Sequence, residues 1–412
     1  MSEISATPEI KNVRDFVSFF IRELKPRGKI FTPFNVITAP IILVGLVLIV
    51  YRFAAGLGAV TNLSQEIPWG LWIGFDVITG VAFAAGGYVV AFMVYIIGGE
   101  KYHSIARAAI LSSFLAYVFY AGGIILDVGR WWNIVNPMIG RKFGVNAVMF
   151  LVAWHFYLYM VAAGLEFSPA AAEWLGMKRL RKILASLTLG AVIFGVALST
   201  LHQSGLGALM SMAKGKIHPL WYTDFIPVLF FVSSIFAGLS VVIFKEMICH
   251  KVFKEQIDEE HRKSFPDIIV SLGKICAVVM FGYFFLKVMM FIHDRNWPYL
   301  NTPMGYWYLT EIIGLVLIPC FMFVHGAQTR NLSFILSAAT LTMIGIIMNR
   351  LNYVFIAYNW QVPLFEKYYP TWMEFVITLT IISVELWVYR WVVNRMSVFR
   401  KPPEWAVEMD KH

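Results

Sequence analysis

Residues 183–210 read ILASLTLGAVIFGVALSTLHQSGLGALM, and the nineteen residues before His202 carry no charged side chain. A helix of about twenty apolar residues is long enough to cross the hydrocarbon layer of a bilayer, which is ~30 Å thick. The stretch therefore predicts a membrane-spanning helix with His202, Gln203 and Ser204 at its end. A titratable histidine at the end of a membrane span needs either a hydrogen-bonding partner or a functional explanation.

Runs of this kind recur along the chain of 412 residues, in which 59% of the residues are hydrophobic and 14% are charged. Soluble domains carry about 25% charged residues, so we expect a polytopic membrane protein. Every backbone polar group that faces lipid must be bonded within the chain, which favours an all-α fold. We predict about ten transmembrane helices, at 36–58, 69–98, 104–127, 144–168, 180–202, 224–247, 268–292, 305–325, 331–357 and 371–394.

The positions of Lys and Arg predict how the chain is oriented. If both termini are cytoplasmic, 22 of these residues lie in inside segments and 9 in outside segments. Such an excess favours cytoplasmic termini in a bacterial inner membrane. We expect a cytoplasmic N-terminal segment (1–35), a transmembrane domain (36–398) and a cytoplasmic tail (399–412). The amphipathic stretch Val13–Leu24 is expected on the membrane surface, and no cleavable signal peptide is expected.

Charge and cysteine content exclude several functions. The formal charge of +9 does not indicate a nucleic-acid partner, because the basic residues stand beside helix ends and set orientation. Cys249, Cys276 and Cys320 form no C-x-x-C motif, so neither an iron–sulfur cluster nor covalent haem is expected in this chain. No metal site is expected, and membrane lipids surround the chain. The loops are short, so any electron donor outside the membrane belongs to another subunit.

Unusual polar residues gather at the outer ends of consecutive predicted helices: Trp69, Asp76, Asp127, Asn146 and His202. An ionisable group at a helix centre costs roughly 2.5–3.5 kcal/mol on insertion scales, so such a group of residues indicates a site. Other interpretations stay open for single members. Asp127 and Arg130 are three residues apart and could form a local ion pair. His202 alone could be a solvated helix end, and tryptophans at this level are typical of the interfacial belt.

Two further sets of polar residues lie elsewhere. Glu166 and Glu385 stand toward the cytoplasmic ends of the fourth and tenth predicted helices, where they suit either a proton wire or helix–helix hydrogen bonding. His155 precedes Glu166 by eleven residues and shares its helix face. Another outer cluster could be a second site, an ion pair or a docking surface, and we favour a structural role; it comprises Glu311, Arg350, Tyr353, Trp372 and Glu374.

Eight phrases in order give the chain a family resemblance: PWGLWIGFD, FAAGGY, LDVGRWWN, VNAVMF, LEFSPA, LHQSGLGALM, HPLW and YPTWMEF. Together they resemble quinone-reactive membrane subunits of the NrfD/PsrC type. The resemblance is strongest to the membrane subunit of hydrogenase-2-type complexes (HybB), and it extends to those of the Qrc and Hmc complexes of sulfate reducers. It covers about residues 40–395.

This resemblance implies two four-helix bundles, at about 69–202 and 224–357, flanked by the first and last helices. It implies that the chain bears no redox cofactor and that menaquinone or ubiquinone is the substrate, bound near the periplasmic face. Electrons would come from a periplasmic four-cluster ferredoxin-like iron–sulfur subunit. That iron–sulfur subunit would receive its electrons from a hydrogenase, or from a multihaem cytochrome c with a molybdopterin-like subunit. His155, His293 and His325 match none of the shared phrases.

We therefore expect a subunit of a quinone oxidoreductase complex, with five quinone-binding residues: Trp69, Asp76, Asp127, Asn146 and His202. Four carboxyl groups are expected to transfer protons: Asp76, Asp127, Glu166 and Glu385. His202 is expected to bond a quinone oxygen because imidazole exchanges protons near neutral pH. Three alternatives stay open: a haem-b electron carrier ligated by His202 and His293, a secondary transporter, and a passive anchor.

Overall fold

Ten of the described helices are long and apolar enough to cross a membrane in a computed structural model, which describes residues 13–27, 29–139, 144 and 146–409. No strand occurs within those ranges, where β-pairing is limited to one isolated bridge between Ile217 and Tyr358. The predicted all-α membrane fold with about ten spans is therefore confirmed. Residues 1–12 of the expected N-terminal segment, and Arg141 and Lys142 of the charge count, lie outside the described residues.

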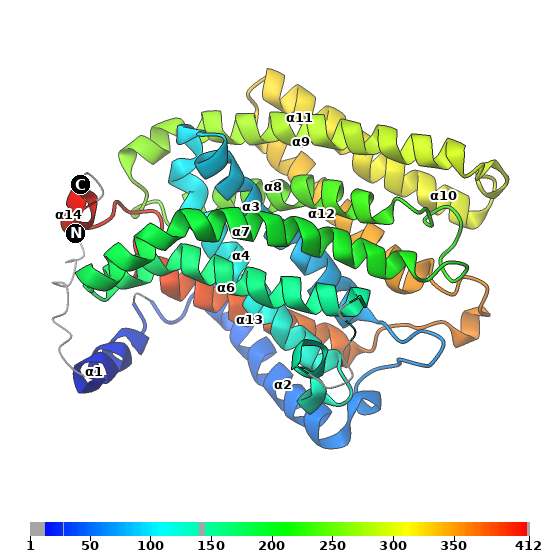
Figure 1. Ribbon diagram of the computed structural model, residues 1–412, viewed down its shortest axis with the longest axis horizontal. Helices are drawn as coiled ribbons and strands as arrows, with labels where there is room; N and C mark the ends of the chain where they lie inside the picture. Colours follow the sequence, from blue (N-terminus) through cyan, green and yellow to red (C-terminus); the bar gives the residue numbers. More distant parts are fainter. Residues whose placement is uncertain (1–12, 28, 140–143, 145, 410–412) are drawn as a thin grey trace.

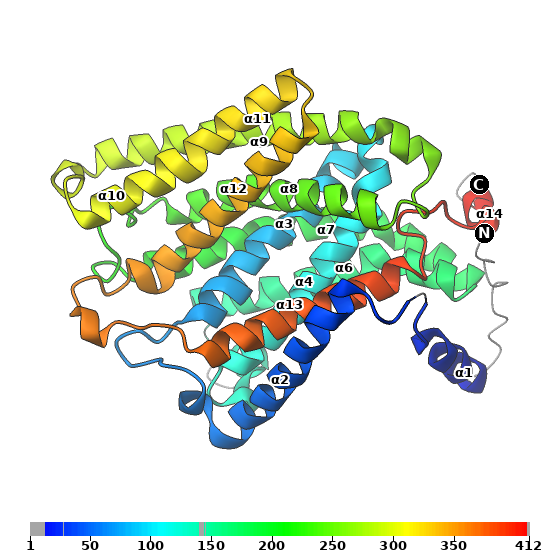
Figure 2. The same cartoon turned by 180° about the vertical axis from the view of Figure 1, so that it is seen from behind.

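Most spans are single α-helices, and three contain π-helical turns (Figures 1 and 2). The continuous spans are α2 (Pro33–Ala55), α4 (His103–Asp127), α6 (Val148–Trp174), α7 (Lys178–Ser211), α8 (Ile226–Val252), α9 (Glu259–His293) and α13 (Trp372–Val393). The second span joins η2 (Trp72–Thr79), α3 (Gly80–Ala91) and η3 (Phe92–Ile96). The eighth joins α10 (Pro303–Leu309), η7 (Thr310–Leu317) and α11 (Ile318–Gln328), and the ninth joins α12 (Leu332–Leu351) and η8 (Asn352–Ile356).

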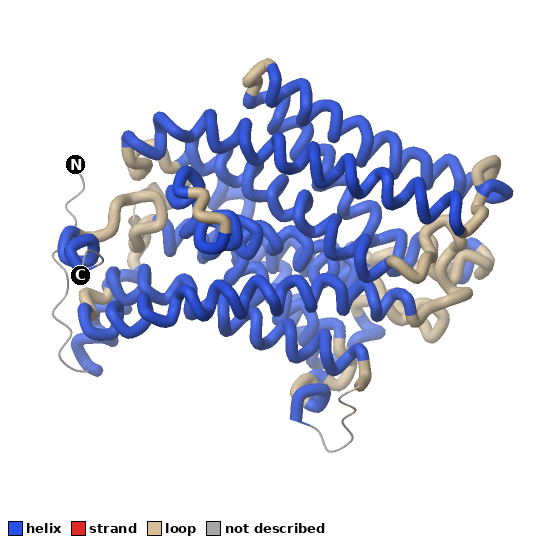
Figure 3. The backbone as a smooth tube through the Cα atoms, turned by 45° about the horizontal axis from the view of Figure 1, so that its top comes forward, coloured by secondary structure: helices blue, strands red, loops and turns tan. Residues whose placement is uncertain are grey.

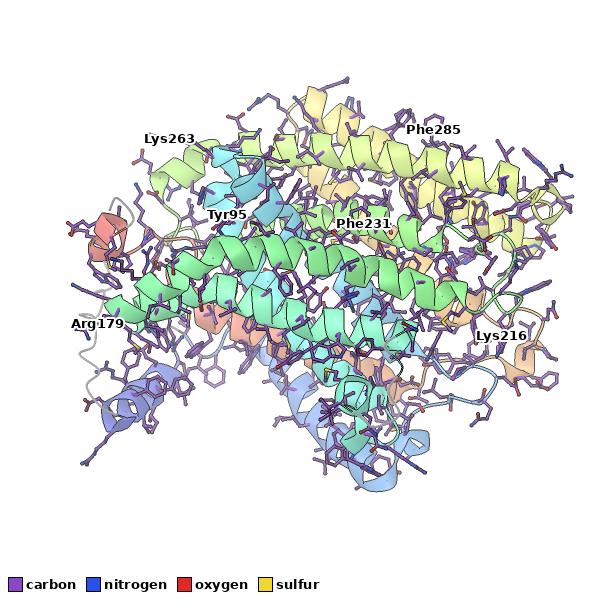
Figure 4. The ribbon with its side chains drawn as sticks, viewed as in Figure 1. Tyr95, Arg179, Lys216, Phe231, Lys263 and Phe285 are labelled. Carbon is purple, nitrogen blue, oxygen red and sulfur yellow. The ribbon has the colours of Figure 1, made fainter. Side chains whose placement is uncertain are left out.

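The first and last described helices, α1 (Val13–Leu24) and α14 (Glu404–Met409), lie at one end of the helical body, here called the terminal end (Figure 1). Helix α1 is held there by α13, since Arg395 Nε donates to the Glu23 carbonyl at 2.6 Å and Trp391 Nε1 donates to it at 3.1 Å. Figure 4 places Arg179 and Lys263 at the terminal end and Lys216 at the opposite end.

Helix contacts run around two groups. The helices α3, α4, α6 and α7 contact one another in a ring, as do α8, α9, α11 and α12. Helix α8 also contacts α3 and α7, so the groups share an extensive boundary, and the division into two independent bundles stays a prediction. Helix α2 packs on α13, which in turn packs on α4 (Figure 2). Figure 3 shows the body as long helices that are joined by loops at their ends. Side chains of α2 such as Leu43 (66% exposed) face outward, as expected for a lipid-facing helix.

Glycines allow α3 and α8 to approach closely. A Cβ on Gly238 would overlap the backbone of Gly86, and a Cβ on Gly86 would lie 2.7 Å from the Gly238 carbonyl oxygen. Small residues at such crossings let helix backbones meet in a membrane, where hydrophobic association is weak. The crossing joins the two groups of helices near the middle of the molecule.

The structure corrects several sequence-based boundaries. Helix α7 continues to Ser211, so His202 lies nine residues inside the helix instead of at its end. Helix α6 begins at Val148, after Asn146. Arg52 and Arg350 were counted as loop charges but are buried at 1% exposure within α2 and α12. Lys245, also counted in a loop, lies within α8.

Candidate functional site

Asp76 is a buried carboxylate near the opposite end of the second span. It lies in η2, is 2% exposed, and accepts a hydrogen bond of 2.9 Å from Thr378 Oγ1 of α13. A Cβ on Gly123 of α4 would lie 3.4 Å from the Asp76 Cβ, so α4 passes close beside it. π-Helical turns often mark functional positions because they leave the regular hydrogen-bond ladder. The carboxylate is held on three sides by η2, α4 and α13.

Asp127 joins this group from the end of α4. Its charge interacts with those of Asp76, Glu374 and Arg52. Its Oδ1 is buried without a hydrogen-bond partner among the described residues. Arg130 is exposed, and no ion pair joins it to Asp127 in the described part of the chain, so the local ion-pair interpretation is wrong. The cation near Asp127 is Arg52 instead.

Arg52 also closes the end of α4. Its Nε donates to the Leu126 carbonyl at 2.6 Å and its Nη2 donates to the Val128 carbonyl at 2.9 Å. The last carbonyl groups of a helix lack partners within the helix, and a cation there complements the helix dipole. Arg52 therefore fixes the position of Asp127 and supplies positive charge beside two buried carboxylates.

A third carboxylate, Glu374, begins α13 at the same level. Thr371 and Glu374 form a capping box, and Tyr368 donates a short hydrogen bond to Glu374 Oε1. Trp72 Nε1 donates to the Glu374 carbonyl at 3.3 Å. These bonds connect α13 to η2, so the flanking helix takes part in the site.

His202 occupies a separate aromatic pocket. It is 1% exposed, and its ring lies 5.9 Å from that of Tyr117 and 5.5 Å from that of Phe156. Its Nδ1 lies 3.2 Å from the Val152 carbonyl, and Nε2 has no partner within the described chain. A carbonyl at Nδ1 favours the tautomer that carries its proton there, which leaves Nε2 as an acceptor. His155 lies near enough for its charge to interact with His202.

One turn of α4 links the two places. The ring of Tyr120 packs against Gly80, one turn after Asp76, and Tyr117, one turn earlier in α4, contacts His202. Gln203 Nε2 donates to the Val81 carbonyl at 2.8 Å, which fixes this part of α7 against α3. The structure therefore brings Asp76 and Asp127 together and places His202 of α7 against Tyr117, in a neighbouring part of α4.

The other two predicted quinone ligands lie farther out. Trp69 is half-buried in the loop before η2, with its ring 6.2 Å from that of Tyr358. Asn146 is exposed in the turn before α6. Neither contacts Asp76 or His202 through a hydrogen bond or ring contact in the part of the chain described.

The predicted proton carriers Glu166 and Glu385 lie deeper, toward the terminal end. Glu385 of α13 lines a cavity of about 50 Å³ together with Lys245 and Glu246 of α8. Glu166 of α6 is half-buried, and its Oε1 has no hydrogen-bond partner among the described residues. Its carboxyl group lies in the neighbourhood of Tyr159, whose hydroxyl lies 3.1 Å from Ser113 Oγ at the cavity wall.

A second group of buried polar residues lies among the helices α8 to α12, toward their opposite end. Glu311 accepts three hydrogen bonds: from Trp221 Nε1 at 2.7 Å, from Asn352 Nδ2 at 2.6 Å and from Asn349 Nδ2 at 2.6 Å. Asn349 in turn accepts from Arg350 Nη1 at 2.7 Å. The predicted outer cluster is therefore divided, because Glu374 belongs to the Asp76 group and Trp372 is 62% exposed. Glu311 and Arg350 are joined through a carboxamide, which suits a structural core.

Sequence reasoning missed Arg52, Thr378, Tyr120, Lys245 and Glu246. Arg52 and Lys245 stand within a few residues of helix ends and resembled loop charges in the printed sequence. Thr378 and Tyr120 lie within apolar runs, where hydroxyl groups commonly bond to the helix backbone. These side chains come together only because helices that are far apart in sequence contact one another in the folded protein.

His218 lies outside the spans, in a cage of aromatic rings from Trp221, Tyr299 and Trp360 at 5.6, 5.3 and 4.7 Å. The Leu220 amide donates to its Nδ1 at 3.2 Å, which requires an unprotonated nitrogen. Burial, and secondly the positive charge of Lys367, lower the pKa of His218 to about 4. The folded protein therefore holds this histidine neutral.

Acid should destabilise the chain through His218. In the unfolded chain its pKa is about 6.5, so the unfolded state binds more protons than the native state between pH 6.5 and 4. The contribution of neutral His218 to the free energy of unfolding is fully present above pH 6.5. It decreases as the pH is lowered, by up to about 2 kcal/mol at pH 5. Thermal unfolding in detergent at pH 7.5 and pH 5 measures this loss. His218→Gln should remove that part of the pH dependence, and an unchanged pH dependence in the variant would contradict the prediction.

Comparison with known proteins adds to this geometry. The family described as "Polysulphide reductase, NrfD" matches residues 59–363. A protein of Nitratidesulfovibrio vulgaris (strain Hildenborough) is 43% identical over 91% of this chain and 96% of its own length. The probable Ni/Fe-hydrogenase 2 b-type cytochrome subunit of Escherichia coli (strain K12) is 30% identical over 93% of this chain and 96% of its own. The integral membrane subunit of menaquinone reductase of N. vulgaris is 25% identical over 86% and 88%.

Proposed function

The chain belongs to the NrfD family, and from this premise we propose that it is the quinone-reactive membrane subunit of a respiratory oxidoreductase complex. Among its similar proteins is the integral membrane subunit of a menaquinone reductase, which supports menaquinone as the substrate. The observation that carries the proposal is the group of buried titratable side chains near one end of the spans. Asp76 and His202 are buried within the spans and Asp127 lies near Asp76, in a membrane environment where such groups are costly and need a function.

Quinone reduction consumes two electrons and two protons, and quinol oxidation releases them. His202 Nε2, free of a partner in the described structure, accepts a hydrogen bond from a quinol hydroxyl, and in its protonated form it donates one to a quinone oxygen. Asp76, fixed by Thr378, exchanges protons with the substrate, and Asp127 supports it under the positive charge of Arg52. Trp69 and Asn146, on the loops at the opposite end, line the mouth of the site. Glu166 and Glu385 carry protons from the terminal end.

The partner subunits complete the reaction. The opposite end is the periplasmic face, the terminal end is cytoplasmic, and a periplasmic iron–sulfur subunit delivers or removes electrons at the Asp76 end. The excess of Lys and Arg at the terminal end supports this orientation. The similarity to a hydrogenase subunit and a menaquinone reductase subunit supports assembly with catalytic and iron–sulfur subunits.

The histidine geometry argues against the haem-b alternative in which His202 and His293 are the ligands. His202 is buried within α7, beside the rings of Tyr117 and Phe156. His293 is exposed at the end of α9. Bis-histidine ligation needs two imidazoles that face one another across the haem.

Substitution of His202 tests the proposed function directly. In the purified complex, His202→Ala should weaken binding of a menaquinone analogue about tenfold and lower quinone-linked turnover by about 10–100-fold, because a hydrogen bond to the substrate and a proton relay are lost. Electron transfer to a soluble dye at the partner subunit should stay unchanged. The matched control is His325→Ala, which removes an exposed histidine at the terminal end. Full turnover and full quinone affinity in His202→Ala would show that His202 is not a ligand.

A further inference from the structure

The cavity near the terminal end lies where α3, α4, α8 and α13 meet. Its volume is about 50 Å³, and its polar lining consists of Ser112, Ser113, Tyr120, Lys245, Glu246, Glu385 and Tyr389. A water needs ~10–15 Å³ on this measure and two to four polar partners. The cavity therefore has room and partners for roughly three waters. Its α3 wall consists of Phe83 and Ala84 together with Gly86 and Gly87, which contribute no side chain.

The cavity wall carries two carboxyl groups and one ammonium group. Lys245 Nζ donates to Ser112 Oγ at 2.6 Å and lies 4.4 Å from the centre of the Tyr389 ring. The carboxyl groups of Glu385 and Glu246 act electrostatically on Lys245. Cys249 Sγ lies 3.8 Å from the Tyr389 hydroxyl. Because one cation cannot neutralise two carboxylates inside a membrane, the group reaches neutrality by holding one further proton.

The cavity is connected to the terminal end through histidines. His261 Nε2, at the start of the seventh span, lies 3.8 Å from Glu246 Oε2. The ring of His250 lies 5.9 Å from that of His261, and its Nδ1 is buried without a partner in the described structure. Arg262 and Asp258 act electrostatically on this pair from the adjoining loop and helix. Glu246 can therefore exchange protons with groups near the terminal surface.

Two lines of hydroxyl groups lead from the cavity toward the opposite end. Tyr120 lines the cavity, and its ring packs on Gly80, four residues after Asp76, since a Cβ on Gly80 would overlap the Tyr120 ring. Ser113, on another wall, lies 3.1 Å from the Tyr159 hydroxyl. The Tyr159 ring lies 4.4 Å from that of Tyr117, which contacts His202. One cavity thus borders the paths to both titratable groups of the proposed quinone site.

We propose that this cavity is a proton-loading site, in which Lys245, Glu246 and Glu385 hold one exchangeable proton for the quinone site. The proposal rests on the proposed function and adds the origin of the protons. Each quinone that is reduced receives two electrons from the iron–sulfur partner and two protons, which form the two O–H bonds of the quinol. Each proton passes from the cavity along Tyr120 to Asp76 or along Ser113, Tyr159 and Tyr117 to His202. His261 and Glu246 reload the cavity from the terminal side, and quinol oxidation runs the same steps in reverse.

The test uses the whole complex in liposomes with a fluorescent pH dye inside and a menaquinone analogue as substrate. Glu385→Gln and Lys245→Met should each keep quinone affinity within about twofold and lower quinone-linked turnover at least about tenfold. Infrared spectra of the wild-type complex should show a protonated carboxylic acid band that shifts in D2O and is absent in Glu385→Gln or in Glu246→Gln. The matched control is Lys274→Met, which removes an exposed lysine of α9 outside the cavity lining and should change neither property.

The outcomes separate the two proposals. If the wild-type complex does not bind the analogue, the proposed function fails. If the wild type binds and turns it over while Glu385→Gln, Glu246→Gln and Lys245→Met all match its turnover, the cavity assignment is overturned. Loss of the infrared band in either Gln variant supports the assignment even where the Lys245→Met complex does not assemble, because the band is measured without turnover.

Discussion

Asp76→Asn is expected to lower quinone-linked turnover by at least about 100-fold while the complex still assembles. The reason is that asparagine keeps the size of the side chain and the bond from Thr378 but cannot carry a proton to the substrate. General acid–base groups contribute about 10²–10⁴-fold to a rate. Turnover with menaquinone, measured against dye reduction at the partner subunit, isolates the membrane step.

Thr378→Val provides the matched control for Asp76. It removes the 2.9 Å hydrogen bond and leaves the carboxyl group, so turnover should fall only a few-fold. A turnover in Asp76→Asn within threefold of the wild type would show that Asp76 transfers no proton. Similar large losses in both variants would show that Asp76 acts through the packing of α13 on η2, because both substitutions disturb that contact.

The sequence predicted the ten spans well, because a run of apolar residues determines a membrane helix without reference to any distant contact. It also singled out Asp76, since a carboxylate several residues inside an apolar run stands out in the printed chain. The fifth span was predicted to end at the polar residues His202, Gln203 and Ser204, whereas α7 continues to Ser211. In the structure a Cβ on Gly207 would lie 2.6 Å from Pro227 Cα, so this glycine serves a close helix crossing.

Residues that act by spatial contact could not be predicted. Arg52 and Asp127 are far apart in sequence and meet only because α2 and α4 end at the same level. Lys245 and Glu385 belong to α8 and α13, which approach one another at the cavity. A hydropathy profile evaluates each charged residue together with its neighbours in sequence. It therefore cannot show that the residue has a partner on another helix. The titratable parts of the site are therefore the least predictable part of this fold.

The Glu311 group should give the largest effect on stability. Glu311→Leu removes the acceptor of three hydrogen bonds and leaves Trp221 Nε1, Asn349 and Asn352 with buried donors. It also removes the carboxylate whose charge interacts with two buried cations, Arg350 (1% exposed) and Lys287 (3% exposed). Breaking one partner of a buried ionic group typically costs about 3–5 kcal/mol. We expect a correspondingly lower unfolding temperature and little assembled complex, measured by fluorescence-detected size exclusion after heating.

A double variant tells whether the loss comes from charge. Arg350 Nη2 donates to Ser233 Oγ at 2.7 Å, and its guanidinium lies 3.8 Å from the centre of the Phe230 ring, so Arg350→Met keeps much of the packing. If unpaired positive charge dominates, Glu311→Leu combined with Arg350→Met should recover 1–2 kcal/mol relative to Glu311→Leu alone, on the order of measured couplings between contacting residues. Glu311→Gln should be milder than Glu311→Leu, because the amide oxygen still accepts a hydrogen bond. Additive losses in the double variant would show that the two groups stabilise the helices independently, and a Glu311→Leu protein as stable as the wild type would refute a structural role for this cluster.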